Sequence, residues 1–211
     1  MRHEATWETD RPGAPAADIG RICVYCGSGT GTDPAFLDCA KTLGHAMGDE
    51  GIGLVYGGGD VGLMGVVADA VLAGGGHVTG VIPKHLWDKE VGHTGLSELL
   101  VVDSMHERKL AMADRSDAFV ALPGGVGTFE ELFEAITWTQ LGIHEKPVGL
   151  LDVAGFYAPL LAFLDSTVDR GFLRPGHREM ILSSTDASDL LDGLAAWEPV
   201  TTSKWLTPDE R

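Results

Sequence analysis

The chain contains 211 residues, and its 15 Lys and Arg against 31 Asp and Glu give a formal net charge of -16. This length is enough for one large domain with a sizeable core. The acidity argues against nonspecific capture of a nucleic-acid polymer or an anionic membrane, because both need a basic surface. A small anionic ligand would need a site that differs locally from the rest of the surface. The 29 glycines are about twice the usual share and follow no collagen-like repeat, so their positions become the question.

The chain ends and the cysteines suggest a cytoplasmic protein. Residues 1–18 are charged and lack an apolar signal segment, which predicts a mobile tail, and residues 201–211 are expected to form a second tail after a domain spanning 19–200. No stretch approaches the roughly 18 to 20 apolar residues of a membrane span. Three cysteines do not make a disulfide framework. Cys23 and Cys26 form a CxxC motif, but strand alternation would point them to opposite faces, so we interpret them as core residues.

Short apolar runs alternate with helical stretches after residue 20. Strands are predicted at 21–26, 52–56, 77–82, 99–102, 118–122 and 148–151. Helices are predicted at 33–50, 63–72, 104–115, 128–141 and 156–170, with a shorter one near 187–197 and a loop over 84–98. Helices between successive strands indicate parallel pairing through right-handed crossovers. The pattern therefore predicts an α/β fold, a single-domain Rossmann-like doubly wound parallel sheet.

Three glycine clusters directly follow predicted strands: GSGTG at 27–31, GGGDVGLMG at 57–65 and GGVGT at 124–128. In an open parallel sheet the carboxyl ends of the strands share one edge, and ligands bind there. Glycine lets the backbone approach a phosphate closely, and the next helix offers free N–H groups and a positive dipole end. Each loop alone is also typical of a tight turn. Together they predict a phosphate cradle built from Gly27, Ser28, Gly57, Gly58, Gly59 and Gly124.

Several familiar sites are missing from the sequence. The first glycine loop gives no GxGxxG pattern, and the sequence contains no GxxxxGK[ST] pattern, which disfavours dinucleotides and triphosphates and leaves a monophosphate as the simplest ligand. The eight histidines show no HExxH or comparable spacing, so we expect no metal and no other cofactor. No GxSxG motif indicates covalent acyl chemistry.

Charged residues cluster near the same sheet edge. Arg108 and Lys109 lie near the start of a predicted helix, where the helix dipole disfavours cations; this suits a nearby anion, although a solvated helix face is the alternative. Glu130 and Glu131 lie in the first part of the helix that GGVGT opens, where acids also serve capping. A carboxylate and a guanidinium beside a phosphorylated sugar suit cleavage of a glycosidic bond.

The run SMHERKLAMADRSDAFVALPGGVGTFEELFEAITWTQLGIHEKPVGLL closely resembles the LOG (Lonely Guy) family of cytokinin riboside 5′-monophosphate phosphoribohydrolases, long misannotated as lysine decarboxylases. The family motif PGGxGTxxE is complete from Pro123 to Glu131, and ICVYCGSG, VYGGGDVGLMG and GVIP support it. The likeness spans about residues 20–195. It implies a Rossmann-like homodimer that hydrolyses the N-glycosidic bond of N6-modified AMP, or of AMP itself, to the free base and ribose 5-phosphate.

The resemblance also implies residue roles. Arg108 and Glu131 correspond to the catalytic pair of the family. The substrate contacts implied by the resemblance are Glu90, Lys109, Gly125, Val126, Gly127, Thr128, Phe129, Glu130 and Thr137.

Two other functions stay open. A nucleotide or molybdenum-cofactor carrier needs the cradle without the catalytic pair. A lysine decarboxylase needs pyridoxal phosphate on a Schiff-base lysine, and no lysine here has a recognisable pyridoxal setting.

Overall fold

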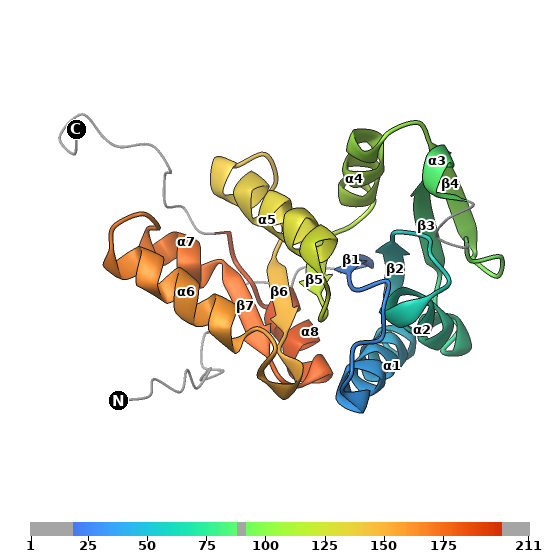
Figure 1. Cartoon of the computed structure of the whole chain (residues 1–211), viewed down its shortest axis with the longest axis horizontal. Helices are drawn as coiled ribbons and strands as arrows, with labels where there is room; N and C mark the ends of the chain where they lie inside the picture. The colour runs from blue at the N-terminus through green and yellow to red at the C-terminus, as the bar shows by residue number, and fades with distance from the viewer. Residues whose placement is uncertain (1–18, 88–91, 200–211) are drawn as a thin grey trace.

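The computed structural model describes residues 19–87 and 92–199, which form one parallel sheet with helices on both faces (Figure 1). Both expected tails, 1–18 and 201–211, lie outside the described residues. The strands are β1 (Arg21–Tyr25), β2 (Gly53–Tyr56), β3 (Val78–Pro83), β4 (Glu98–Val102), β5 (Ala118–Ala121), β6 (Val148–Leu151) and β7 (Ile181–Ser184). The helices are α1 (Pro34–Asp49), α2 (Gly62–Ala73), α3 (Lys84–Trp87), α4 (Met105–Asp114), α5 (Val126–Leu141), α6 (Ala158–Asp169), α7 (Pro175–Glu179) and α8 (Ala187–Ala195), with a 3-10 turn η1 (Val153–Gly155).

The strand order creates a switch point in the middle of the sheet. The order is β4-β3-β2-β1-β5-β6-β7, and each neighbouring pair is parallel. The chain moves outward from β1 to β4 and then returns to β5 on the other side of β1. The pairing of Tyr25 with Ala121 makes β1 and β5 end side by side. Open α/β sheets bind ligands where the direction of winding reverses in this way.

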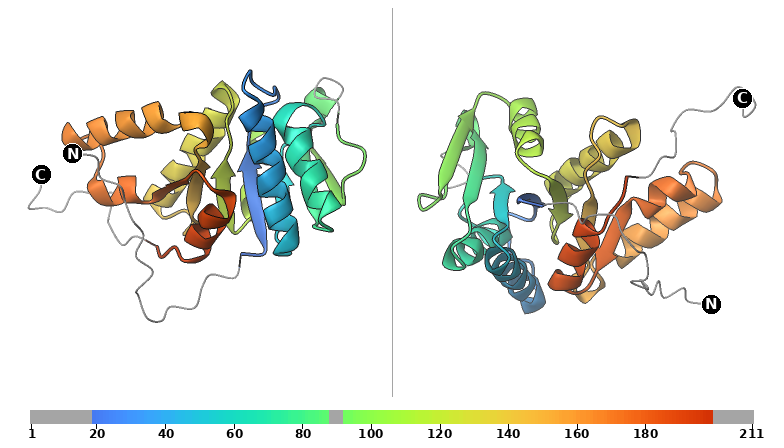
Figure 2. Two further views of the ribbon diagram at one scale, coloured as in Figure 1. Left: turned by 90° about the horizontal axis from the view of Figure 1, so that it is seen from below. Right: turned by 180° about the vertical axis from the view of Figure 1, so that it is seen from behind.

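Strand alternation divides the apolar residues between two cores. Ile22 and Val24 pack with α1, α2 and α8 on one face, whereas Tyr25 and Phe119 pack with α4, α5 and α6 on the other. In Figure 1 the first set of helices lies below the strands, and α4 and α5 lie above them; Figure 2 shows the same layers from two further directions. Cys23 and Cys26 belong to different cores, which confirms that the CxxC motif consists of two core residues.

The structure confirms the doubly wound parallel sheet and differs from the predicted elements in three places. The predicted 84–98 loop begins with the short helix α3, and both α7 and the edge strand β7 were not predicted. The third difference bears on the site. Helix α5 begins at Val126 rather than at Thr128, because Gly125 in extended conformation serves as its N-cap. Val126 and Gly127 therefore belong to the first helical turn.

Candidate active site

The three glycine loops meet at the carboxyl end of β1. The Gly27 N–H donates to the Pro123 carbonyl at 3.0 Å, which joins the first loop to the third across the switch point. The Leu63 N–H donates to the Gly27 carbonyl at 3.1 Å, which joins the first loop to the second. A Cβ on Gly124 would collide with the Thr128 side chain and would lie 2.9 Å from the Gly27 nitrogen. Glycine is therefore needed at position 124 for the loops to pack this closely.

The third loop leaves the N terminus of α5 exposed. No side chain caps this helix at its Gly125 N-cap, whereas Asp33 and Ser104 cap α1 and α4. Gly125, Val126 and Gly127 are all exposed. Because the first N–H groups of a helix lack intrahelical partners and lie at its positive end, this turn suits an anion.

The second loop is buried, and its carbonyls are engaged by the protein. Gly57, Gly58 and Gly59 are all buried. The Gly57 carbonyl accepts a hydrogen bond from Arg108 Nη2 at 2.9 Å, and the Gly58 carbonyl accepts one from the His93 N–H at 3.0 Å. The loop therefore supports the residues around it, in contrast to the exposed turn at the start of α5.

Arg108 is held in a buried position over the second loop. It lies on α4 and only 5% of its surface is exposed. Its Nη1 lies 3.8 Å from the Met105 Sδ, one helical turn earlier. A Cβ on Gly57 would collide with the guanidinium, so glycine at this position makes room for the arginine. Arg108 is therefore fixed in place by a close approach that only glycine allows.

Glu131 lies on α5 and acts electrostatically on Cys23 and Tyr25 of β1. Burial is the main reason why the pKa of the Cys23 thiol is raised well above its ordinary range. The Glu131 carboxylate raises that pKa further, and the Arg108 guanidinium lowers it. Glu131 also raises the pKa of Tyr25, again after burial. The charges of Arg108 on α4 and Glu131 on α5 thus both act on the Cys23 thiol in β1, with opposite signs.

Lys109 and Glu130, the chain neighbours of that pair, form an ion pair between the same two helices. Lys109 Nζ lies 2.5 Å from Glu130 Oε1 and 2.8 Å from Glu134 Oε2. Burial by itself lowers the pKa of Lys109, but the hydrogen bonds to the two carboxylates outweigh burial and raise it. The ammonium is therefore held charged and ties α4 to α5 directly beside Arg108 and Glu131.

The remaining residues predicted for the site lie along α5, in the first loop or outside the described residues. Phe129 and Thr128 lie in α5, partly buried and buried respectively. Thr137 lies further along α5, and its hydroxyl donates to the Phe133 carbonyl of its own helix at 2.6 Å. Ser28 is exposed in the first loop. Glu90 lies outside the described residues.

Sequence reasoning missed an aromatic cluster beside the third loop. Phe156 stacks on Phe129 with ring centroids 6.3 Å apart and makes an edge contact with Phe36 at 5.8 Å. The adjacent Tyr157 donates its hydroxyl to the Leu122 carbonyl at 2.7 Å, and its N–H donates to Asp152 Oδ1 at 2.6 Å. The cluster joins the starts of α1, α5 and α6. The sequence marks it only by the FY pair after β6, because its partners are distant along the chain.

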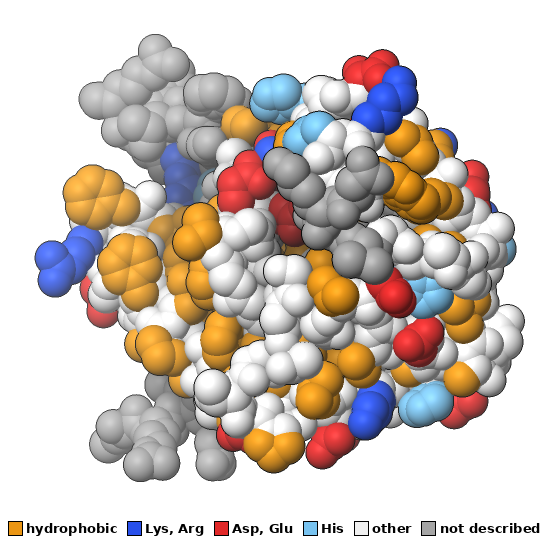
Figure 3. Space-filling model, turned by 45° about the vertical axis from the view of Figure 1, so that its right-hand side comes forward, with side chains coloured by type: hydrophobic (Ala, Val, Ile, Leu, Met, Phe, Trp, Pro, Cys, Tyr) orange, Lys and Arg blue, Asp and Glu red, His pale blue; other side chains and the backbone are white. Residues whose placement is uncertain are grey.

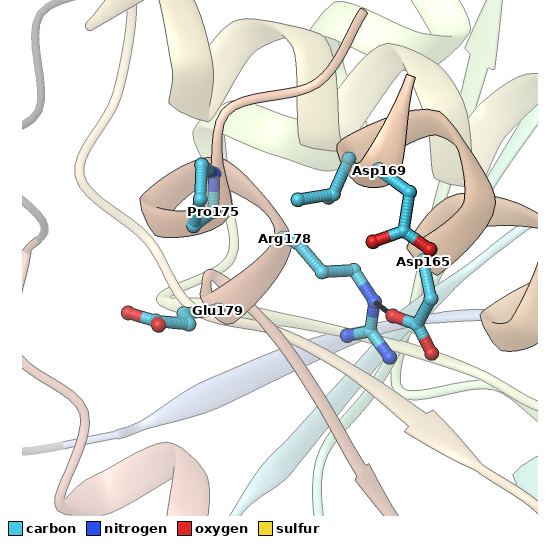
Figure 4. Close-up of a pocket in the computed structure, with 6 residues that line it drawn as sticks. Asp165, Asp169, Pro175, Arg178 and Glu179 are labelled. Atoms are coloured by element: carbon cyan, nitrogen blue, oxygen red, sulfur yellow. Dashed lines mark hydrogen bonds and ion pairs between the residues drawn. The ribbon is translucent and has the colours of Figure 1, made fainter. Parts of the chain in front are cut away.

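On the face shown in Figure 3, the charges of the described residues do not gather into a second site. Over the coloured part of the face in Figure 3, acidic side chains are dispersed and the few basic ones are separate from one another. A groove of about 250 Å³ lies between α6 and α7, where Arg178 Nε pairs with Asp165 Oδ1 at 2.8 Å (Figure 4). It contains none of the predicted site residues. Among the described residues, no three His, Cys, Asp or Glu side chains are placed to hold a metal ion, and no helix is long and apolar enough to cross a membrane.

Fold and site together define a Rossmann-like α/β protein with a glycine-rich ligand edge that carries a buried Arg and a Glu. Residues 64–194 match the family model described as "possible lysine decarboxylase". The chain is 52% identical over 179 residues to cytokinin riboside 5′-monophosphate phosphoribohydrolase LOG7 of Arabidopsis thaliana, covering 85% of this chain and 82% of that protein. It is 53% identical to the rice (Oryza sativa subsp. japonica) enzyme LOG, covering 85% and 74% of the two chains. The chain belongs to the LOG family.

The structure of the chain also resembles a solved structure whose sequence is much less similar. The molybdenum cofactor binding protein of Rippkaea orientalis superposes with a TM-score of 0.62 at 21% identity, over 84% of this chain and 96% of that one. At this level of identity the likeness shows a shared fold and carries no further inference about function.

Proposed function

We propose that the chain hydrolyses the N-glycosidic bond of cytokinin riboside 5′-monophosphates to the free base and ribose 5-phosphate. The observation that carries the proposal is the ion pair of Lys109 with Glu130, which joins α4 to α5 at the chain neighbours of Arg108 and Glu131, close to the exposed first turn of α5. The curated relatives at 52% and 53% identity, named for this activity, support it.

The chemistry follows from the charges at this edge. The N–H groups at the start of α5, from Gly125 to Thr128, hold the 5′-phosphate together with Ser28, while Gly27 and Gly124 let the first and third loops pack closely enough to form the site. Glu131 stabilises the oxocarbenium-like centre that develops at C1′ and directs the incoming water. The water oxygen bonds to C1′ as the C1′–N9 bond breaks, and one water proton ends on the departing base. Arg108 offsets the negative charge of the phosphate and of the leaving group.

The other implied contacts join the proposal with different roles. Lys109 and Glu130 border the site and hold α4 against α5. Phe129 and Thr137 contact the substrate along α5. The glycines of the second loop shape the site through Arg108.

We further propose a cytoplasmic homodimer. Exposed apolar side chains on α4 and α5 support a second copy as the occupant of this surface; they are Met105, Leu110, Val126 and Phe133. Cys23, Cys26 and Cys39 are free thiols, which is compatible with a reducing compartment. Light scattering should give twice the chain mass, and a monomer would contradict the dimer.

The family description as a lysine decarboxylase does not fit the described lysines. A Schiff base with pyridoxal phosphate needs a neutral amine. Lys109 is held as an ammonium between two carboxylates, and Lys84 pairs with Asp103 at 2.6 Å. Lys146 donates to the Ala113 carbonyl at the opposite edge of the sheet. We therefore derive no step that uses this cofactor.

Product analysis tests the proposed reaction. Purified protein is incubated with isopentenyladenosine 5′-monophosphate, AMP and other nucleoside monophosphates, and the products are separated by chromatography. Release of free base and ribose 5-phosphate supports the proposal. Recovery of tightly bound, unchanged nucleotide would favour a carrier, and no release from any nucleotide would overturn the hydrolase assignment.

A further inference from the structure

A buried histidine outside the second glycine loop, with no part in the reaction derived above, is hydrogen-bonded to that loop. His93 precedes β4 and only 8% of its surface is exposed. Its backbone N–H donates to the Gly58 carbonyl at 3.0 Å, and its neighbour Gly92 forms an antiparallel bridge with Gly59. The segment that starts at Gly92 therefore lies along the loop whose first residue, Gly57, holds Arg108.

The ring of His93 has a defined tautomer. The Gly95 N–H donates to Nδ1 at 3.0 Å, so Nδ1 carries the lone pair. The proton of a neutral ring is then on Nε2, which lies 3.0 Å from Asp69 Oδ1 on α2 and 3.6 Å from Asp60 Oδ1 in the loop. One side chain thus connects the loop, the helix that follows it and the segment before β4.

We propose that His93 is a positioning residue that acts on the reaction through Arg108. It fixes the loop from Gly57 to Asp60, and the Gly57 carbonyl in turn orients the guanidinium by its 2.9 Å hydrogen bond. Loss of the ring contacts to Asp69 and Asp60 releases the segment at His93, whose backbone is hydrogen-bonded to Gly58, so the loop shifts and the guanidinium shifts with it. Displacements of about 1 Å at a catalytic group can lower a rate by about a hundredfold. This inference rests on the proposed function for its effect on rate, but the structural link to Arg108 is independent of it.

Three variants test the link. His93→Leu removes the ring contacts to Gly95, Asp69 and Asp60 and should lower kcat at least about tenfold, with KM changed less than about twofold. His93→Gln places an amide N–H near the position of Nε2 and should recover most of the lost kcat. Asp69→Ala removes the acceptor from a side chain that is 72% exposed, so it keeps the fold, and should lower kcat about threefold. The matched control is His45→Leu on the exposed face of α1.

Two readouts separate positioning from simple destabilisation. In an Arg108→Lys background, His93→Leu should lower kcat by less than about twofold, because its effect is transmitted through the guanidinium. The Arg108 side-chain Nε–H signal in an ¹⁵N-arginine NMR spectrum should move in His93→Leu and stay in place in His45→Leu.

The outcomes distinguish this inference from the proposed function. An inactive wild type whose Arg108 signal moves on substitution of His93 overturns the proposed reaction and leaves the link standing. An active wild type, with kcat and the Arg108 signal unchanged in both His93→Leu and Asp69→Ala, overturns the positioning role. If His93→Leu fails to fold, Asp69→Ala and His93→Gln decide the question by the same two readouts.

Discussion

The two edges of the sheet use polar residues in opposite ways. At the amino edge, polar groups are paired locally: Asp117 Oδ2 accepts from the Gly20 and Arg21 N–H groups at 3.0 and 2.8 Å. Ser116 donates to the Met112 carbonyl and Lys146 to the Ala113 carbonyl, at 2.8 and 2.7 Å. These contacts join the starts of β1 and β5 to each other and join the end of α4 to the residues before β5 and β6.

At the carboxyl edge, the three loops that meet consist largely of glycine, and the charged side chains lie on the neighbouring helices α4 and α5. Gly57 and Gly124 allow contacts that a Cβ would block, and Arg108 is buried there although it carries a full charge. Burying a charge costs stability unless other groups compensate, so this edge gives up stability to hold a reactive arrangement. Substitutions at the carboxyl edge should therefore change catalysis, and substitutions at the amino edge should change stability alone.

The largest expected effect comes from Glu131→Gln. It keeps the shape of the side chain and removes its negative charge, so kcat for base release should fall by at least about a thousandfold. The unfolding temperature should stay within a few degrees of the wild type. Glu145→Gln, an exposed substitution after α5, is the control. Retention of more than a tenth of the activity would remove Glu131 from the reaction.

Gly57→Ala should have the next largest effect. The new methyl group would strike the Arg108 guanidinium, and its displacement should lower kcat by about a hundredfold. The matched control is Gly193→Ala inside α8, where the nearest atom, Leu182 Cδ1, lies 3.9 Å from the new Cβ. That control should keep full activity and raise stability by about 0.5 to 1 kcal/mol. Equal activity in both variants would show that the reaction does not depend on the close approach of Gly57 and Arg108 at the carboxyl edge.

Lys109→Met should affect both properties, because this residue ties the two site helices together. It leaves Glu130 and Glu134 without their shared cation, which should cost about 2 kcal/mol and lower the unfolding temperature by about 4 to 8 °C. Calorimetry and steady-state kinetics measure the two effects. Adding Glu134→Gln should recover part of the stability. A variant as stable as the wild type would show that the ion pair does not hold α4 against α5.

His144 at the amino edge should give the smallest effect, on stability alone. Burial, followed by the charge of Lys146, lowers the pKa of His144 to about 4 from an ordinary 6.5. As the pH falls, His144 is therefore protonated in the unfolded chain before it is protonated in the folded protein. Its contribution to the free energy of unfolding is complete above pH 6.5 and is lost towards pH 4. Between pH 7.5 and 5.5, the wild type should lose about 1 kcal/mol more than His144→Phe.

Denaturant unfolding at the two pH values measures this difference. Phenylalanine keeps the stacking on Phe119, where the ring centroids are 5.1 Å apart in the wild type. Base release at pH 7.5 should be the same in both proteins. An equal loss of stability in wild type and variant would show that the pKa of His144 does not differ between the folded and the unfolded state. A loss of activity in the variant would contradict its assignment to a purely structural edge.

Sequence patterns predicted the architecture because its signals are local. Each of the three glycine clusters follows an apolar run, and this was enough to place the loops at one edge. Strand β7 was missed because ILSS is short and half polar, and its position depends on pairing with β6. The start of α5 was misjudged because Gly127 is a poor helix former, and tertiary context overrides that preference.

The candidate site was only partly predictable for a similar reason. Its charged residues are visible in the sequence as HERK and FEE, but their pairing is not. The ion pair of Lys109 with Glu130 joins residues 21 positions apart, and the Arg108 contact with Gly57 spans 51 positions. His93 carries no motif at all, since its importance depends on where the segment before β4 returns to the second loop.

The most direct test of the account compares a substrate with and without its phosphate. Isopentenyladenosine 5′-monophosphate and isopentenyladenosine share the base and the bond to be cleaved, and differ only in the group assigned to the glycine edge. Two or three charge-assisted hydrogen bonds to the phosphate predict that kcat/KM favours the monophosphate by at least about a hundredfold. Equal kcat/KM values for the two compounds, or cleavage of neither, would contradict the account.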